Sequence, residues 1–181
     1  MLIRKIISGG QTGVGRGAIE AALEAGFPYG GFIPKRRLAE DGMVPGKFTA
    51  MEVVPRLDYI FRTERNVQHS HATLIISREP IGESKIATVN RSETQLTYDC
   101  CRRYRKPVLV LRKQELDRTM EWLKEVQGKV DAEKEGLILN VAGPRESKAK
   151  GIQESTKAFI TRLVEAVRKK QAIGGTKRRN S

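Results

Sequence analysis

The chain has 181 residues, of which 39% are hydrophobic and 30% are charged, and its formal net charge is +13. This size and hydrophobic content favour one compact domain over residues 1–171, followed by a basic and flexible tail over residues 172–181. No run of about 18 apolar residues could span a bilayer and the first residues lack the pattern of a secretory signal, so we expect a cytoplasmic protein with no membrane partner.

The positive charge raises the possibility of nucleic-acid binding, because basic surfaces gain affinity from phosphate contacts. The basic cluster around Arg102 and Arg103, however, lies at the end of an expected helix, where cations complement the helix dipole. Aromatic residues make up only 6% of the chain and do not alternate with basic ones, which disfavours stacking on bases. The adjacent Cys100 and Cys101 suit neither a disulfide nor a metal site and are expected to be packing thiols.

Short apolar runs rich in β-branched residues alternate with helical patterns along the chain. The expected strands cover residues 3–8, 29–33, 72–77, 108–111 and 137–141. A first helix has Ala18, Ile19, Ala22 and Leu23 on one face, and further helices are expected over residues 94–104, 116–127 and 154–170. Nearly continuous apolar strands are typical of parallel sheets covered on both faces. The pattern predicts an α/β fold, a Rossmann-like three-layer α/β/α sandwich with a mostly parallel sheet.

Ligands of such folds bind at the carboxyl ends of the strands, and the first strand ends in the glycine-rich stretch GGQTGVGR at residues 9–16. Glycines there let backbone N–H groups converge at a helix N-terminus, where the dipole favours an anion. The stretch is neither a Walker A loop nor the dinucleotide fingerprint, so a phosphate-binding loop and a purely structural turn both stay open. The candidate ligand contacts are Gly9, Gly10, Gln11, Thr12, Gly13 and Arg16.

The next motif, GGFIPKRRLAEDGMVP at residues 30–45, overlaps the end of the second expected strand and continues as a long loop with no expected secondary structure of its own. It places Lys35 near Glu40 and Asp41, which indicates either a functional loop or a solvated charged one. In the following stretch, Arg62 and Asn66 are spaced to share a face of a short helix.

A second polar concavity is expected from two further segments. RSETQLT opens a helix with Ser92 and Glu93 at its cap and with Thr94 and Thr97 in its first turns. LNVAGPRESK leaves the last strand through Asn140, Gly143, Arg145, Ser147 and Lys148, although Ser147 could instead cap the last helix. His69 and His71 are two residues apart with no third ligand nearby, so no metal site is expected.

These motifs together resemble the molybdenum carrier proteins, a family within the SLOG or lysine-decarboxylase-like superfamily of Rossmann-like ligand binders. The resemblance covers residues 7 to about 163. The motifs that carry it are SGGQTGVGR (8–16), GGFIPKRRLAEDG (30–42), RTERNVQHSHATLI (62–75), TQLT (94–97), KPVLVL (106–111) and LNVAGPRESK (139–148). The chain departs from the family pattern at Gly15 and His71, where relatives have aspartate, and at Glu93, where they have glycine.

The resemblance implies a pocket for a nucleotide-like or pterin ligand, with a phosphate on the glycine-rich loops and the molybdenum cofactor (molybdopterin) or a nucleotide as the bound group. A homo-oligomer is implied by the superfamily alone. Two alternatives stay open: a nucleotide phosphoribohydrolase-like enzyme using Glu40 or Asp41, and a DNA-interacting protein. No catalytic residue is named. The expected binding residues are Gly9, Gly10, Gln11, Thr12, Gly13, Arg16, Lys35, Glu40, Asp41, Arg62, Asn66, Thr94, Thr97, Asn140 and Arg145.

Overall fold

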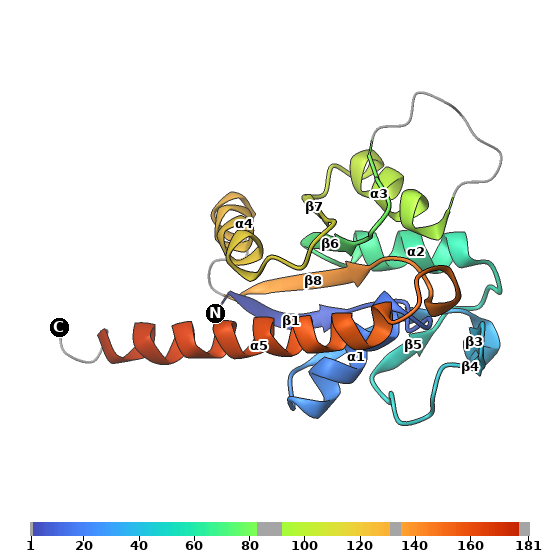
Figure 1. The fold of residues 1–181 in the computed structure, drawn as a ribbon, viewed down its shortest axis with the longest axis horizontal. Helices are drawn as coiled ribbons and strands as arrows, with labels where there is room; N and C mark the ends of the chain where they lie inside the picture. Colours follow the sequence, from blue (N-terminus) through green and yellow to red (C-terminus); the bar gives the residue numbers. More distant parts are fainter. Residues whose placement is uncertain (1, 83–91, 131–134, 178–181) are drawn as a thin grey trace.

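The computed structural model describes residues 2–82, 92–130 and 135–177, and its centre is a six-stranded sheet in which every neighbouring pair is parallel (Figure 1). The strand order is β5-β2-β1-β8-β6-β7. The strands are β1 (Ile3–Ile7), β2 (Tyr29–Ile33), β5 (Met51–Val53), β6 (Ala72–Ile76), β7 (Val108–Leu111) and β8 (Leu137–Ala142). The α/β fold with a parallel sheet is therefore confirmed.

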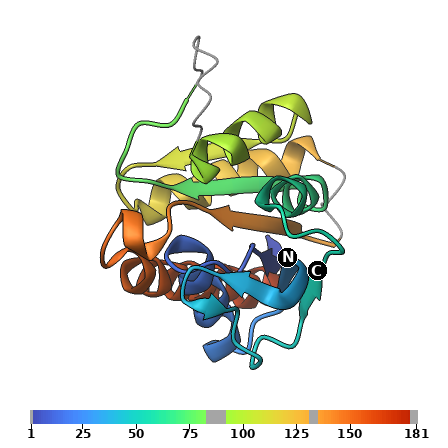
Figure 2. The same cartoon turned by 90° about the vertical axis from the view of Figure 1, so that its right-hand side faces the viewer.

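Helices cover both faces of this sheet (Figure 2). One core cluster joins the central strands to α1 (Val14–Glu24), α4 (Leu116–Lys129) and α5 (Ile152–Lys177). On the other face, α2 (Tyr59–Gln68) packs against α3 (Glu93–Arg103), with Val67 and the two cysteines buried between them. Cys100 and Cys101 are buried free thiols, so they act as packing residues. Burial is also the main cause that raises the pKa of each thiol to about 11.

The path of the chain through the sheet creates a crevice at its centre. From β1 the chain moves outward through β2 to β5, crosses to β6 and β7, and then returns to insert β8 between β1 and β6. The carboxyl ends of β1 and β8 thus lie side by side at the point where the order of the strands reverses. Open parallel sheets bind ligands at such a point.

The segment after β2 differs from the expected structureless loop. It contains a short 3₁₀ helix, η1 (Lys35–Arg37), a small antiparallel hairpin of β3 (Leu38–Ala39) and β4 (Gly42–Met43), and then the edge strand β5. The loop prediction was wrong because Val44, Phe48 and Met51 bury their side chains in a second core cluster with Ile19 and Ile33. Their uneven spacing matches neither a strand nor a helix period.

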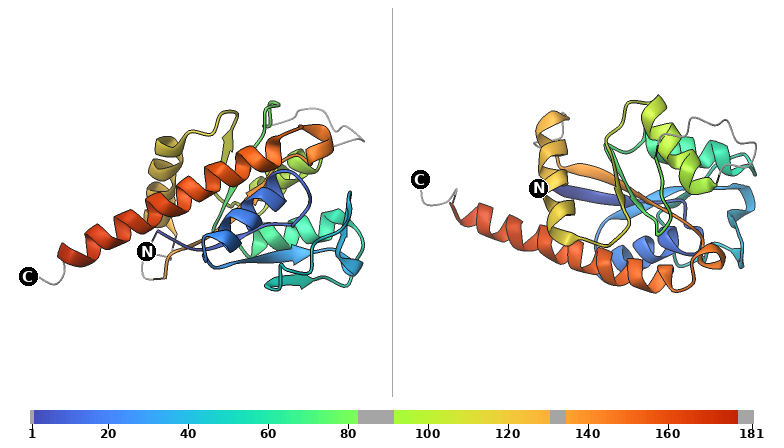
Figure 3. Two further views of the ribbon diagram at one scale, coloured as in Figure 1. Left: turned by 60° about the horizontal axis from the view of Figure 1, so that its bottom comes forward. Right: turned by 45° about the horizontal axis from the view of Figure 1, so that its top comes forward.

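The last helix, α5, also differs from its prediction at both ends. It begins at Ile152, and the Glu146 side chain accepts hydrogen bonds from the N–H groups of Gly151 and Gln153. The alternative cap, Ser147, instead donates its hydroxyl to Glu40. The helix continues to Lys177 rather than ending at Lys170, and it extends past the sheet (Figure 3). Of the predicted basic tail, residues 178–181 lie outside the described residues. In the described segments, no helix has the length and hydropathy that crossing a bilayer requires.

Candidate functional site

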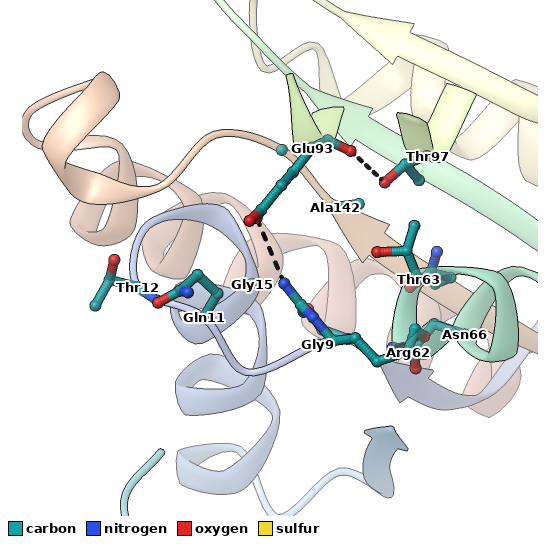
Figure 4. Close-up of a pocket in the computed structure, with 13 residues that line it drawn as sticks. Gly9, Gln11, Thr12, Gly15, Arg62, Thr63, Asn66, Glu93, Thr97 and Ala142 are labelled. Carbon is teal, nitrogen blue, oxygen red and sulfur yellow. Dashed lines mark hydrogen bonds and ion pairs between the residues drawn. The ribbon is translucent and has the colours of Figure 1, made fainter. Parts of the chain in front are cut away.

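A small polar cavity lies at the carboxyl ends of β1 and β8, at the strand-order reversal (Figure 4). Its volume is about 40 Å³, enough for a few water-sized groups. The wall is made by the glycine-rich loop after β1, the first turns of α2 and α3, and the end of β8. The lining residues are Ser8, Gly9, Gln11, Thr12, Gly15, Arg62, Thr63, Asn66, Glu93, Thr97, Asn140, Ala142 and Gly143.

The glycines of the first loop have different structural reasons. A Cβ at Gly9 would lie 1.4 Å from Nη1 of Arg62, so this glycine makes room for the arginine. Gly13 has φ +79° and a Cβ there would lie 2.3 Å from the Pro144 carbonyl oxygen, so it allows the loops after β1 and β8 to touch. Gly15 lines the cavity, as Gly9 does, and a Cβ there would lie 2.8 Å from Oγ of Ser8, another lining residue, so this glycine keeps a side chain out of the cavity.

The N-terminus of α1 is largely satisfied by the protein itself. The N–H groups of residues 12–14 donate to Gln11 Oε1 at 3.0 Å, Gln153 Oε1 at 3.1 Å and the Pro144 carbonyl at 3.2 Å, respectively. Among the described residues, no oxygen accepts a hydrogen bond from the N–H groups of Gly9, Gly10 or Gly15. Of these three, Gly9 and Gly15 line the cavity, so the backbone donors that a ligand could use belong to them rather than to residues 12–14.

Arg62 is the main charge of the cavity. It comes from the first turns of α2, is only 6% exposed and reaches across Gly9, as Figure 4 shows. Its Nη2 lies 3.4 Å from Oε2 of Glu93, the first residue of α3, and the other oxygen of Glu93 accepts a hydrogen bond from Arg145. Both guanidinium groups lie 5.1 Å from the centre of the Tyr59 ring. One carboxylate thus holds together two arginines from distant parts of the chain.

Burial and pairing act differently on these two arginines. Burial is the main influence on Arg62 and lowers its pKa against the attraction of Glu93. At Arg145 burial also lowers the pKa, but the hydrogen bond and charge of Glu93 outweigh it and leave the pKa raised. Guanidinium groups stay protonated in proteins, so both remain cationic and the site has a net positive charge beside one carboxylate.

Two buried donors in the cavity wall have no partner. Among the described residues, Nε of Arg62 and Nε2 of Gln11 are buried nitrogens with no hydrogen-bond acceptor. Gln11 is 6% exposed, and its Oε1 is held by the N–H groups of Thr12 and Glu40, which fixes the position of the amide. An unpaired buried donor is costly, so both groups favour an acceptor in the cavity.

The two carboxylates between β3 and β4 belong to a second cluster, which we call the latch and which shares Thr12 with the cavity wall. The latch consists of Thr12, Arg16, Glu40, Asp41 and Ser147. Glu40 accepts hydrogen bonds from the hydroxyl groups of Thr12 and Ser147 and from the Ser147 N–H. Arg16 donates to both oxygens of Asp41. These contacts fasten the β3–β4 hairpin to the first loop and to the loop after β8.

The hydrogen bonds of the latch lower the pKa of both of its carboxyl groups. Burial raises the pKa of Glu40, but the hydrogen bonds from Ser147 and Thr12 outweigh it and hold the pKa below its ordinary value. At Asp41, the hydrogen bond from Arg16 is the main cause that lowers the pKa. Both carboxylates are therefore ionised near neutral pH, and their hydrogen-bond donors come from the protein itself, which leaves them less capacity to contact a ligand.

A larger crevice of about 750 Å³ adjoins the cavity and shares Glu93 and Gly143 with it. Its wall is formed by the segment after β6, the start of α3 and the loop after β8. The basic residues that line it are Arg78, Arg145, Lys148 and Lys150. The geometry thus offers a small donor-rich cavity opening beside a wide basic crevice.

The structure divides the predicted binding residues among these features. Those that line the small cavity are Gly9, Gln11, Thr12, Arg62, Asn66, Thr97 and Asn140. The larger crevice has Thr94 and Arg145, whereas Arg16, Glu40 and Asp41 border a third hollow at the latch. Gly10, Gly13 and Lys35 line none of these three.

Some of the cavity's polar side chains serve the fold. Asn66 accepts a hydrogen bond from the Phe32 N–H and donates to the Phe32 carbonyl, both at 2.9 Å, and so ties α2 to β2. Asn140 donates to Thr73 at 3.3 Å. His71 lies at the opposite end of the sheet, where its Nδ1 accepts a hydrogen bond from the Ile138 N–H. In the described part of the chain, no group of three potential metal ligands occurs.

Four residues that line the two hollows but were not among the predicted ones stand at strand ends. Ser8 follows β1, Ala142 ends β8, and Ser77 and Arg78 follow β6. Their position in the last place of an expected parallel strand, or directly after one, was the available signal. Small or common residue types did not mark them out from ordinary loop residues.

Comparisons with known proteins agree with this architecture. The chain is similar to the crystal structure of a protein from Syntrophus aciditrophicus SB that is described as a "Putative molybdenum carrier protein": the sequences are 36% identical, the TM-score is 0.70, and the match covers 90% of this chain and 94% of that one. No curated protein matches the sequence. Residues 6–164 match the model of the circularly permutated YpsA SLOG family. The chain therefore belongs to the circularly permutated YpsA SLOG family.

Proposed function

We propose that this protein is a carrier that binds a phosphate-bearing pterin or nucleotide-like ligand, with the anionic group in the small cavity and the rest of the molecule in the adjoining crevice. The observation that carries the proposal is the pair of buried donors without acceptors, Arg62 Nε and Gln11 Nε2, in a cavity at the strand-order reversal. A phosphate oxygen is the acceptor that a guanidinium and an amide would share.

The molybdenum cofactor fits this description in one respect, since its pterin bears a phosphate. The neighbour from Syntrophus aciditrophicus is described as a molybdenum carrier, which supports this ligand class for the present chain. The residues that would hold the phosphate are Gln11, Arg62 and the backbone around Gly9 and Gly15. The cofactor would bring its own metal chemistry, and the protein would contribute binding and shielding from water.

The alternatives have less support. A hydrolase needs a free carboxylate near the ligand, whereas Glu40 and Asp41 are engaged in the latch. DNA binding is favoured only by overall charge. A cytoplasmic location and self-association stay predictions.

Native mass spectrometry of protein purified gently and without oxygen is the direct test. We expect a non-covalent mass that is lost on denaturation and that corresponds to a pterin or a nucleotide. Protein that is empty in repeated preparations would contradict tight carriage.

A substitution tests the cavity itself. Gln11→Glu keeps the oxygen that accepts from Thr12 and Glu40 but replaces the unpaired donor by a negative charge. We expect the affinity for AMP, used as a probe, to fall at least about tenfold in calorimetric titration. The matched control is Gln68→Glu, an exposed residue at the end of α2, which should bind as the wild type does. Equal affinities of the two variants would remove the cavity from the site.

A further inference from the structure

We propose that Glu93 is a built-in competitor for the anionic group of the ligand, so that an anion enters the site only when the Glu93 carboxylate leaves the two arginines. This inference rests on the proposed function and adds the element that decides which anions the site accepts. It follows from the place of Glu93 between the cavity and the crevice.

The first step is the position of the carboxylate. Glu93 lines both hollows and extends from the start of α3 towards Arg62 on the opposite wall, as Figure 4 shows. Its two oxygens are divided between Arg62 and Arg145. A phosphate that approached from the crevice would meet this carboxylate at the cation pair.

The second step is the stability of the cation pair. The two guanidinium groups lie at the same distance, 5.1 Å, from the ring of Tyr59, and both are cationic. Like charges that share one aromatic ring in a partly buried site need an anion near them. Glu93 supplies that anion in the absence of a ligand, and a phosphate could take its place.

The third step concerns the buried donors that the Glu93 carboxylate does not contact. Glu93 contacts Nη2 of Arg62, while Nε of the same guanidinium and Nε2 of Gln11 still have no acceptor. A carboxylate has only two oxygens, and here they are divided between two arginines. A tetrahedral oxyanion has more oxygens and could serve the arginines and the unpaired donors together.

The consequence is selectivity. A small free anion must displace Glu93 with only its own contacts, whereas a larger ligand also gains contacts in the 750 Å³ crevice. The carboxylate therefore disfavours inorganic phosphate and admits a phosphate that is attached to a larger body. Gly15 is consistent with this arrangement, because the absence of a side chain there leaves space in the cavity beside Ser8.

The test is a calorimetric titration of inorganic phosphate into full-length wild type, Glu93→Gln, Glu93→Asp and Glu93→Gln combined with Gln11→Glu. We expect Glu93→Gln to bind phosphate at least tenfold more tightly than the wild type. Glu93→Asp keeps the charge but is one methylene shorter and cannot reach both arginines equally well, so a smaller gain is expected. The combined variant should lose the gain, because the Gln11 donor is also absent.

The control is Glu154→Gln, which removes the same charge from the first turn of another helix, α5, at an exposed position. It should bind phosphate as weakly as the wild type. Thermal unfolding of each protein with and without phosphate adds a second measurement, and the melting temperature of Glu93→Gln should rise most when phosphate is added. This comparison is internal to each variant, so an altered basal stability of Glu93→Gln does not affect it.

The outcomes separate this inference from the function on which it rests. If Glu93→Gln binds phosphate no better than the wild type while Gln11→Glu still weakens AMP binding, the anion site stands and the role of Glu93 is overturned. If no variant binds phosphate up to about 10 mM and none binds AMP, the proposed site itself is overturned. A gain in Glu154→Gln equal to that in Glu93→Gln would show a general charge effect and would contradict the inference.

Discussion

The latch and the cavity both pair acidic residues with arginines around the same glycine-rich loop. They differ in how far the hydrogen-bonding groups of these residues find partners within the protein. In the latch, Glu40 receives three hydrogen bonds and Asp41 is held at both oxygens by Arg16. In the cavity, Glu93 is divided between two arginines, and the Nε of Arg62 has no acceptor. Gln11 joins both regions, with its oxygen in the latch and its nitrogen unpaired.

This difference indicates which charged residues stabilise the fold and which are kept for a ligand. A satisfied network has little to gain from another molecule, whereas buried donors without acceptors gain a full hydrogen bond when a ligand arrives. Residue type alone would not separate the two regions, since both contain arginines and carboxylates. Substitutions on each side should therefore separate stability from binding.

The largest effect is expected at Gly13, which belongs to the structural side. Gly13→Ala would place Cβ 2.3 Å from the Pro144 carbonyl oxygen in a residue with φ +79°. We expect the free energy of unfolding to fall by about 3 kcal/mol, because strain and backbone overlap act together. Urea unfolding would measure it. Gly46→Ala is the control, since no heavy atom lies within 4 Å of its Cβ position, and a similar loss there would contradict the contact argument.

The next effect separates binding from stability at Gly9. The added Cβ of Gly9→Ala would meet the Arg62 guanidinium rather than backbone, and the side chain can move away. We expect AMP affinity to fall about tenfold, or 1.4 kcal/mol, with a smaller loss of stability than for Gly13→Ala. Titration of the variant beside Gly46→Ala checks this. Unchanged binding would mean that Arg62 does not contact the ligand.

A moderate effect on stability alone is expected from Glu40→Gln. The variant keeps the shape of the side chain but replaces the charge that Thr12 and Ser147 contact. Because Glu40 is partly in solvent, we expect a loss of about 1 kcal/mol in unfolding free energy and no change in AMP affinity. Glu52→Gln, at an exposed position on β5, should change neither quantity. A clear loss of AMP binding by Glu40→Gln would place the latch in the ligand site.

The smallest effect is the pH dependence of the latch. The folded-state pKa values of Glu40 and Asp41 lie below the ordinary values of 4.5 and 3.8, so the two groups contribute stability above those values. That contribution should be lost as the pH falls below about 4 through the lowered folded-state pKa values. In unfolding measurements between about pH 5 and 3, the variant with both Glu40→Gln and Asp41→Asn should lose less stability than the wild type. Parallel curves would contradict the stabilising role of the latch carboxylates.

The succession of strands and helices along the chain could be predicted largely from the sequence. Continuous apolar strands such as residues 72–77 and the stripe of α5 are local patterns, and hydrophobic periodicity determines them directly. The short strand β5 and the β3–β4 hairpin could not be predicted, because two or three residues give no period. They depend on Val44, Phe48 and Met51 reaching a core built by distant residues.

The sequence by itself determined the α/β fold and indicated that polar loops follow the strands at one edge of the sheet. Tertiary structure alone decided that Gly9 makes room for Arg62, that Glu40 and Asp41 form the latch, and that Glu93 joins Arg62 to Arg145. The physical reason is the range of the interactions. Secondary structure depends on neighbours within a few residues, whereas the partner of a charge depends on which distant segments the folded sheet brings within hydrogen-bonding distance.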